Sequence, residues 1–274
     1  MNQAIQIGIG SYTFTWAIGV PGYPPSRPLS VYDLIEKATT LQAPVVQLAD
    51  NIPLDNFSEE GLSELLRLTE KRSIRLEVGS KGLTTQRLKK YIQITRRLHS
   101  DTLRFVIDEA GYYPSPQQVV QIITSLLPEL EAAQIRLVLE NHDRLKAKEF
   151  VFIIHACNSR HVGICLDTVN SLGVPEGTEE VIRELLPYTF NLHIKDFQIE
   201  RLPHKMGFSI AGTPAGKGKL DIKRIMSELN TIGQCPSAIL ELWTPFRISL
   251  EETIRKENEW AIESMNYLTQ LKYE

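Results

Sequence analysis

The chain has 274 residues, of which 42% are hydrophobic and 23% are charged, and it contains 16 glycines and 15 prolines. These values are typical of a globular protein and argue against a disordered, collagen-like or low-complexity chain. The formal net charge of −3 argues against a nucleic-acid-binding protein or a basic membrane-surface protein, because both classes usually carry an overall positive charge.

The N-terminal segment MNQAIQIGIGSYTF lacks the basic start and the apolar stretch of a signal peptide. No window reaches the roughly 18 consecutive apolar residues that a membrane span requires. Three scattered cysteines, Cys157, Cys165 and Cys235, show no paired spacing and therefore indicate neither a disulfide framework nor a zinc site. We expect a cytoplasmic protein that binds neither nucleic acid nor membrane.

Short apolar or β-branched runs recur along the whole chain, most of them without strict alternation. This pattern is typical of parallel strands that are buried on both faces. The predicted strands cover residues 5–12, 45–50, 74–80, 102–108, 136–142, 162–168, 190–197 and 238–243.

Segments with helical spacing lie between these runs. Residues 85–98 and 116–133 each place apolar side chains on one stripe, and Ser115-Pro116 is a typical helix start. A capping-box pattern begins at Ser249, and Asp221 is a predicted cap for a short helix that ends near Gly233.

Eight strands with a helix after each, in about 250 residues, predict an α/β fold of the (β/α)8 TIM barrel type. We expect a single domain over residues 1–274, because no linker or shift in composition divides the chain. An open, doubly wound sheet is the alternative. Against it, Gly8 and Gly10 lie in the first strand with no third glycine opening a helix, and no Walker loop is present.

Active sites of such barrels lie at the carboxyl ends of the strands. The last four predicted strands each bring an ionisable residue to this end: Glu140, Asp167, His193 and Glu241. Charges this deep in apolar strands are costly unless they are paired or bound to a metal. Three carboxylates and one imidazole can share a buried site only if a cation compensates their negative charge. Such an oxygen-rich set of ligands suits Mn²⁺, Mg²⁺ or Co²⁺ better than a structural zinc.

Several motifs resemble the xylose isomerase-like TIM barrel superfamily, which includes sugar isomerases and epimerases, inosose and dehydroshikimate dehydratases, and endonuclease IV. The matching segments, in chain order, are LENHD (139–143), CLDTVN (165–170), NLHIKD (191–196), GTPAGKGKLD (212–221) and LELW (240–243). The resemblance implies one divalent metal ion, with Mn²⁺ expected first, held by Glu140, Asp167, His193 and Glu241.

In the ketose 3-epimerases of this superfamily, two glutamates also transfer the proton, one on each face of the sugar. Glu140 and Glu241 match these positions and are the predicted catalytic residues. The chemistry agrees, because a metal that chelates a carbonyl and the neighbouring hydroxyl acidifies the C–H between them and stabilises the ene-diolate. One carboxylate can take the proton and the other can return it.

Further residues are candidates for substrate binding. His142 and Lys195 share strand parity with Glu140 and His193, so both should face the pocket. Asn170 follows Asp167 by three residues, where some epimerases of the group have a histidine that contacts substrate. Trp16 and Trp243, together with Tyr12, are candidate walls for a sugar face, although packed aromatic residues are the more common explanation.

The loop after the seventh strand carries an excess of positive charge. Residues 193–219 contain five Lys or Arg residues, Arg201 among them, against two acidic residues, a balance of +3. Either the loop is simply solvated, or Arg201 and its neighbours attract an anionic sugar acid or phosphate. In the second case Gly212, Gly216 and Gly218 would let the backbone approach the substrate closely.

The leading hypothesis is a metal-dependent isomerase or epimerase of a keto sugar or sugar acid. The alternative is a lyase on the same scaffold, a decarboxylase or dehydratase of a 3-oxo sugar acid, which needs the same metal-stabilised enolate. An endonuclease IV-type repair enzyme and a non-catalytic sugar-binding barrel fit less well, since only six histidines are present and a complete ligand set is retained. The sequence leaves the sugar and the oligomeric state open, a homo-oligomer included.

Overall fold

The computed structural model describes residues 4–273, and eight parallel strands close into a barrel in this range. The predicted domain of residues 1–274 also includes residues 1–3 and 274, which lie outside the described part of the chain. The barrel strands are β1 (Gln6–Gly10), β2 (Val45–Leu48), β3 (Arg75–Lys81), β4 (Thr102–Val106), β5 (Arg136–Glu140), β6 (Val162–Asp167), β7 (Thr189–Ile194) and β10 (Ser237–Leu240).

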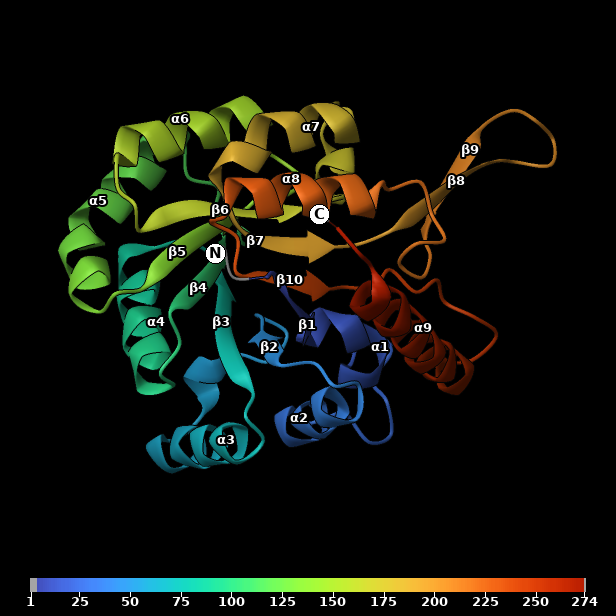
Figure 1. The fold of residues 1–274 in the computed structure, drawn as a ribbon, viewed down its shortest axis with the longest axis horizontal. Helices are drawn as coiled ribbons and strands as arrows, with labels where there is room; N and C mark the ends of the chain where they lie inside the picture. Colours follow the sequence, from blue (N-terminus) through green and yellow to red (C-terminus); the bar gives the residue numbers. More distant parts are fainter. Residues whose placement is uncertain (1–3, 274) are drawn as a thin grey trace.

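The strands follow the order of the chain around the barrel, and β10 closes it by pairing with both β1 and β7. Figure 1 shows the strands at the centre with the helices outside them. This closure confirms the TIM-barrel prediction and excludes the open, doubly wound sheet. Most strands read as apolar runs because their outer faces pack against helices and their inner faces fill the barrel.

Helices follow the strands as expected. Ser115 caps α5 with a reciprocal capping box, and the Ser249 side chain accepts a hydrogen bond from the backbone N–H of Glu252 at the start of α9. Gly233 ends α8 with a φ of 76°, a conformation that favours glycine. The helices are α1 (Thr15–Ile18), α2 (Val31–Thr40), α3 (Glu59–Lys71), α4 (Thr85–Arg97), α5 (Pro116–Ala132), α6 (Ala147–Cys157), α7 (Thr178–Leu185), α8 (Ile222–Ile232) and α9 (Leu250–Gln270).

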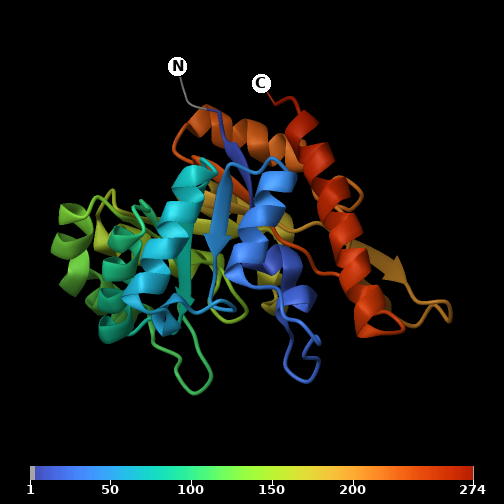
Figure 2. The same cartoon turned by 90° about the horizontal axis from the view of Figure 1, so that it is seen from below.

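In the described part of the chain, larger elements are connected by four short 3-10 helices: η1 (Ser11–Phe14), η2 (Leu54–Asn56), η3 (Asn170–Gly173) and η4 (Leu186–Tyr188). Figure 2 shows that the loops after β1 and β4 extend from the same end of the barrel. Each of these loops contains a short antiparallel bridge, Val20 to Tyr23 and Glu109 to Tyr112. The loops therefore flank the end at which parallel strands present their carboxyl termini.

The segment after β7 contains a hairpin that the sequence did not predict. Strands β8 (Phe197–Arg201) and β9 (Phe208–Gly212) pair antiparallel to each other and lie outside the barrel sheet. In Figures 1 and 2 this hairpin projects away from the body of the barrel. The predicted seventh strand, residues 190–197, extends to Phe197, beyond the end of β7 at Ile194, because periodicity alone does not show where a strand leaves its sheet.

Within residues 4–273, no helix combines the length and the apolar composition that crossing a membrane requires.

Candidate metal centre and active site

The four predicted metal ligands meet at the carboxyl end of the barrel. Glu140 and Asp167 are the last residues of β5 and β6, His193 is the penultimate residue of β7, and Glu241 directly follows β10. The His193 Nδ1 atom lies 3.3 Å from a Glu140 oxygen, 3.8 Å from an Asp167 oxygen and 3.2 Å from a Glu241 oxygen. All four side chains are at most 2% exposed.

Two atoms at this point, His193 Nδ1 and Glu241 Oε1, have no hydrogen-bond partner among the described residues, and a third, Asp167 Oδ2, has only an ion-pair contact with the Lys195 ammonium at 2.9 Å. Such buried orphans are rare unless a ligand satisfies them. Ligand atoms of Asp167, His193 and Glu241 lie within 4.8 Å of one another. The geometry therefore fits a divalent cation bound by hard oxygen ligands and one imidazole.

Local hydrogen bonds hold the Asp167 carboxylate in place. Its Oδ1 atom accepts hydrogen bonds from the backbone N–H groups of Val169 and Asn170, both at 2.8 Å. The side chain of Asn141 bridges to the backbone of Asp167 from the neighbouring strand. Since Oδ1 is occupied in this way, Oδ2 is the oxygen that points to the metal position.

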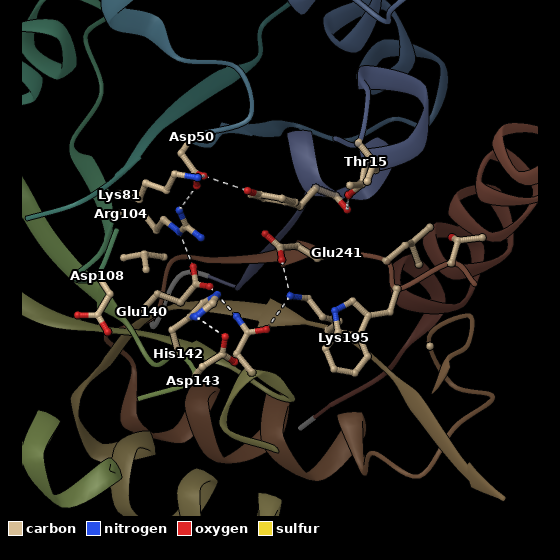
Figure 3. A pocket seen from close by; sticks show the side chains of 18 of the residues that line it. Thr15, Asp50, Lys81, Arg104, Asp108, Glu140, His142, Asp143, Lys195 and Glu241 are labelled. Atoms are coloured by element: carbon tan, nitrogen blue, oxygen red, sulfur yellow. Dashed lines mark hydrogen bonds and ion pairs between the residues drawn. The ribbon is translucent and has the colours of Figure 1, made fainter. Parts of the chain in front are cut away.

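Two buried cations pair with the predicted catalytic glutamates. The guanidinium of Arg104, on β4, forms an ion pair with Glu140 Oε2, and the Lys195 ammonium lies 2.9 Å from both Glu241 and Asp167. The Asn170 side chain connects these two ion-paired groups, because its amide donates a hydrogen bond to Glu140 Oε1 at 2.8 Å and accepts one from the Lys195 ammonium at 3.2 Å. Figure 3 shows Arg104 beside Glu140 and Lys195 pointing towards Glu241.

A second carboxylate extends this charge network towards the solvent. Asp50, just after β2, lies 2.9 Å from Arg104, 3.1 Å from the Lys81 ammonium and accepts a hydrogen bond from Tyr12 at 3.0 Å. Burial of Asp50 favours its neutral form, but the charges of Arg104 and Lys81 outweigh this and lower the pKa of Asp50 to about 2. The Asp50 carboxylate is therefore ionised at neutral pH and holds Arg104 in place.

A cavity of about 900 Å³ opens above this centre, a size that suits a sugar-sized ligand. Trp16 lines one wall and packs against Tyr23 and Phe246, with ring centroids 5.7 and 5.5 Å away. Trp243 lies 5.9 Å from the Lys195 ammonium. The structure places all but one of the predicted substrate-contacting residues in the lining: Trp16, His142, Asn170, Lys195 and Trp243, with Tyr12 beside them.

Arg201 is the predicted substrate residue that the structure does not bring to this cavity. It ends β8 in the projecting hairpin, and its guanidinium lies 4.4 Å from the ring of Phe208. Among the described residues that line the cavity, Lys195 is the one cation from the basic segment 193–219. The excess charge of that segment is therefore not gathered over the metal position.

The glycines of the segment 212–218 make a contact within the chain as well as lining the cavity. Backbone N–H groups of Gly216 and Gly218 donate to the Asp196 carboxylate at 3.0 and 2.8 Å. A Cβ atom at Gly218 would lie 2.0 Å from Asp196 Oδ1, so glycine is needed there for an internal contact. Gly212 does line the cavity, where a side chain would collide with Trp243.

Three residues of the ion-pair network beside Glu140 were missed from the sequence: Asp50, Lys81 and Arg104. A signal was present, because Asp50 ends the run VVQLAD, Lys81 ends β3, and Arg104 interrupts the apolar run TLRFVID. Asp50 and Lys81 lie at or just after the ends of β2 and β3, where the position that identifies Glu140 and Asp167 also identifies them. Arg104 lies in the middle of β4, and its signal is the charge within a buried run.

The sequence profile of the xylose isomerase-like TIM barrel family matches residues 54–271. The chain belongs to this family. Among curated relatives, it is 31% identical to the 3-oxo-isoapionate decarboxylase of Pectobacterium atrosepticum over 264 residues, which cover 96% of this chain and 94% of that protein.

Solved structures of the same fold include members with different functions. D-psicose 3-epimerase from Clostridium cellulolyticum H10, solved with D-tagatose, superposes with a TM-score of 0.72 and 15% identity, covering 97% of each chain. A xylose isomerase-like TIM barrel protein from Mycobacterium smegmatis, solved in complex with magnesium, gives a TM-score of 0.69 and 15% identity over 98% of this chain and 100% of that one. At this identity the likeness shows the fold alone. The family contains enzymes of more than one reaction class, so membership alone does not fix the reaction.

Protons should compete with the metal at His193. Burial disfavours the charged ring, but the carboxylates of Glu241 and Glu140 outweigh it and raise the pKa of His193. A metal has to displace this proton from Nδ1, so we expect metal affinity to rise with pH and to keep rising above the ordinary histidine pKa of about 6.5. Isothermal titration with Mn²⁺ in buffers of different ionisation enthalpy should detect proton release. Affinity and heat that do not change with pH or buffer would contradict this assignment.

Proposed function

We propose that this protein is a metal-dependent decarboxylase of a 3-oxo sugar acid, with Glu140, Asp167, His193 and Glu241 holding one divalent ion, Mn²⁺ or Mg²⁺ before Co²⁺. The observation that carries the proposal is the pairing of both glutamates with buried cations, Glu140 with Arg104 and Glu241 with Lys195. A carboxylate next to a fixed positive charge is a weak base.

Decarboxylation does not need a base to remove a proton from carbon. The bond between the carboxylate and its neighbouring carbon breaks, CO₂ leaves, and the electron pair moves towards the 3-oxo group. When bound, the divalent ion supplies a Lewis acid that stabilises negative charge on that oxygen. The carbon that lost CO₂ then needs one proton, so the reaction requires an acid in the site and not a base.

Lys195 is the proposed donor of this proton. Burial disfavours its charged form, but Asp167 and Glu241 outweigh burial and raise the pKa of Lys195, so it would release a proton only when a bound divalent ion shares these two carboxylates. It is 6% exposed, lines the cavity and contacts both Asp167 and Glu241. Arg104 is the other buried cation, but a guanidinium keeps its proton at any ordinary pH. Asp167, Glu241 and Asn170 position the ammonium, and Trp16 and Trp243 exclude water from one side of the substrate.

The relative from P. atrosepticum supports the same reaction class, since it is named for the decarboxylation of 3-oxo-isoapionate. That compound is therefore the first substrate to test. Epimerisation of a keto sugar is the second candidate, favoured by one observation: oxygens of Glu140 and Glu241 both lie close to His193 Nδ1, at 3.3 and 3.2 Å. Two carboxylates at one metal position are what proton transfer on two faces of a sugar requires.

The test is an assay of 3-oxo sugar acids and neutral keto sugars in D₂O, with Mn²⁺ or Mg²⁺ present. We expect CO₂ release from an acid substrate and one deuterium at the carbon that carried the carboxylate. An epimerase would instead introduce deuterium into a keto sugar without loss of mass, and a dehydratase would release water. Either of these results, with no CO₂ from any acid in the panel, would refute the proposed reaction.

A further inference from the structure

A group of polar side chains fills the barrel interior directly below His193. Gln47 on β2, Glu77 on β3, Asn191 on β7 and Ser237 on β10 are each at most 1% exposed. This layer of a TIM barrel is usually packed with branched apolar side chains. Buried polar groups are costly unless they are hydrogen-bonded, so a polar layer here requires a complete set of partners.

The Glu77 carboxylate organises this layer. Its Oε2 atom accepts hydrogen bonds from the side-chain amides of Gln47 and Asn191, both at 3.0 Å. Its Oε1 atom accepts from the Ser237 hydroxyl and lies 3.1 Å from the Arg75 guanidinium. A carboxylate paired with arginine only accepts hydrogen bonds. Every neighbour of Glu77 must therefore turn a donor towards it.

This requirement fixes the side-chain amide of Gln47. Its Nε2 atom faces two acceptors, Glu77 Oε2 and Asn191 Oδ1, each at 3.0 Å. Asn191 cannot reverse, because its own Nδ2 donates to Glu77 and Ser237 and its Oδ1 accepts from the Cys165 thiol. The carbonyl oxygen of Gln47 therefore points towards His193 and lies 2.7 Å from its Nε2 atom.

The Gln47 carbonyl in turn determines the tautomer of His193. A carbonyl oxygen cannot donate, so the ring must carry a hydrogen on Nε2 to make this bond. In the neutral ring the lone pair is then on Nδ1, the orphaned atom that faces Glu140, Asp167 and Glu241. The hydrogen bond made by one ring nitrogen generally decides which nitrogen binds a metal.

We propose that Glu77 and Gln47 are positioning residues that act in series: Glu77 orients the amide of Gln47, and Gln47 holds His193 with Nε2 protonated and Nδ1 free for the metal. This inference rests on the proposed metal role of His193 and is independent of which reaction the enzyme catalyses. It assigns a function to the buried charge of Glu77, which lies two hydrogen bonds away from the metal ligand.

The experiment compares three variants of the full chain. Gln47→Met removes the acceptor at similar size, and Glu77→Gln gives the neighbouring amide freedom to reverse. Ser237→Ala is the matched control, because it also removes a buried hydrogen bond to Glu77 but leaves the bond between Gln47 and Glu77 Oε2. Mn²⁺ affinity is measured by calorimetry, and the His193 tautomer by ¹⁵N NMR of metal-free, histidine-labelled protein at a pH where the ring is neutral. His193→Gln assigns the signal, and thermal unfolding confirms that each variant is folded.

We expect Gln47→Met and Glu77→Gln to populate the Nδ1-protonated tautomer and to bind Mn²⁺ about 10–100-fold more weakly. Ser237→Ala should lower thermal stability with little change in tautomer or affinity. The proposal is overturned if folded Gln47→Met keeps wild-type affinity, or if Ser237→Ala weakens Mn²⁺ binding as much as Glu77→Gln does. It is also overturned, without any variant, if the neutral His193 ring of the wild-type protein carries its hydrogen on Nδ1. Failure of the metal site itself is a separate result, seen when wild-type protein does not bind Mn²⁺.

Discussion

The Asp167→Asn variant is expected to lose metal binding and activity while remaining folded. Asparagine keeps the Oδ1 atom that accepts the two backbone hydrogen bonds at 2.8 Å, but it replaces Oδ2, which lies 2.9 Å from the Lys195 ammonium, with an NH₂ group that cannot bind a cation. Removing one partner of a buried charge interaction costs about 3–5 kcal/mol. Metal affinity should therefore fall by roughly 10²–10⁴-fold.

Calorimetry with Mn²⁺ and thermal unfolding of the metal-free protein measure the two parts of this expectation. Asp50→Asn is the matched control, because it makes the same chemical change at a carboxylate that lines the cavity and pairs with Arg104 but is not a predicted metal ligand. It should affect metal affinity far less. Equal losses in both variants would show that total charge, and not ligation by Asp167, holds the ion. An Asp167→Asn variant that is unfolded would make Asp167 a structural residue.

The Lys195→Met variant should retain its metal and lose turnover. The change removes the ammonium that lies 2.9 Å from Asp167 and Glu241 but keeps most of the side-chain volume. Removing a catalytic proton donor typically costs roughly 10²–10⁴-fold in rate. Metal affinity should be unchanged or higher, because a positive charge beside the metal position has been removed. Steady-state rates of CO₂ release, measured with metal occupancy, check the prediction.

Lys195→Arg separates proton donation from charge pairing. Arginine preserves the positive charge between Asp167 and Glu241 but keeps its proton at any ordinary pH. If Lys195 is the acid, this variant should be nearly as slow as Lys195→Met. Wild-type turnover in Lys195→Arg would limit Lys195 to holding the two carboxylates in place. Lys81→Met serves as a control at the exposed side of the cavity, where the Lys81 side chain is 47% exposed, and should have a much smaller effect.

The two function classes differ in what they require of the cations in this site. An epimerase needs at least one glutamate that gains and loses a proton, and a neighbouring cation opposes that gain. Burial favours the neutral form of Glu241, but His193 and Lys195 outweigh it and lower its pKa. The arrangement of Arg104 and Lys195 suits carboxylates that stay ionised as ligands, which is why the proposed reaction leaves proton donation to the ammonium.

Much of the fold could be predicted because its signals are local. Apolar runs, helical stripes and caps at Ser115 and Asp221 each depend on residues close together in the sequence. The predicted ligand set follows from the same strands, because a parallel barrel brings all carboxyl ends to one end. Thus Glu140, Asp167, His193 and Glu241 could be expected to lie together before any distance was known.

Other features depend on where the chain turns between elements. Residues 193–219 contain two examples. Strand β7 ends at Ile194 and is followed by a hairpin. Further along, the backbone N–H groups of Gly216 and Gly218 donate hydrogen bonds to the carboxylate of Asp196. The charge excess and the glycine spacing were both real, but neither indicates which group the loop contacts. The projecting position of Arg201 follows from the turn after β7 and not from the local composition.

Local sequence patterns were thus enough to predict the barrel, the end at which the site lies and the four residues that we propose hold a metal. Which charges neutralise one another depends on the folded chain. Arg104 pairs with Glu140, 36 residues away, and with Asp50, 54 residues away in the other direction. Gln47 meets His193 across 146 residues. The physical reason is that ion pairing and hydrogen bonding depend on distances of a few ångströms across the closed barrel, and closure sets these distances independently of separation along the chain.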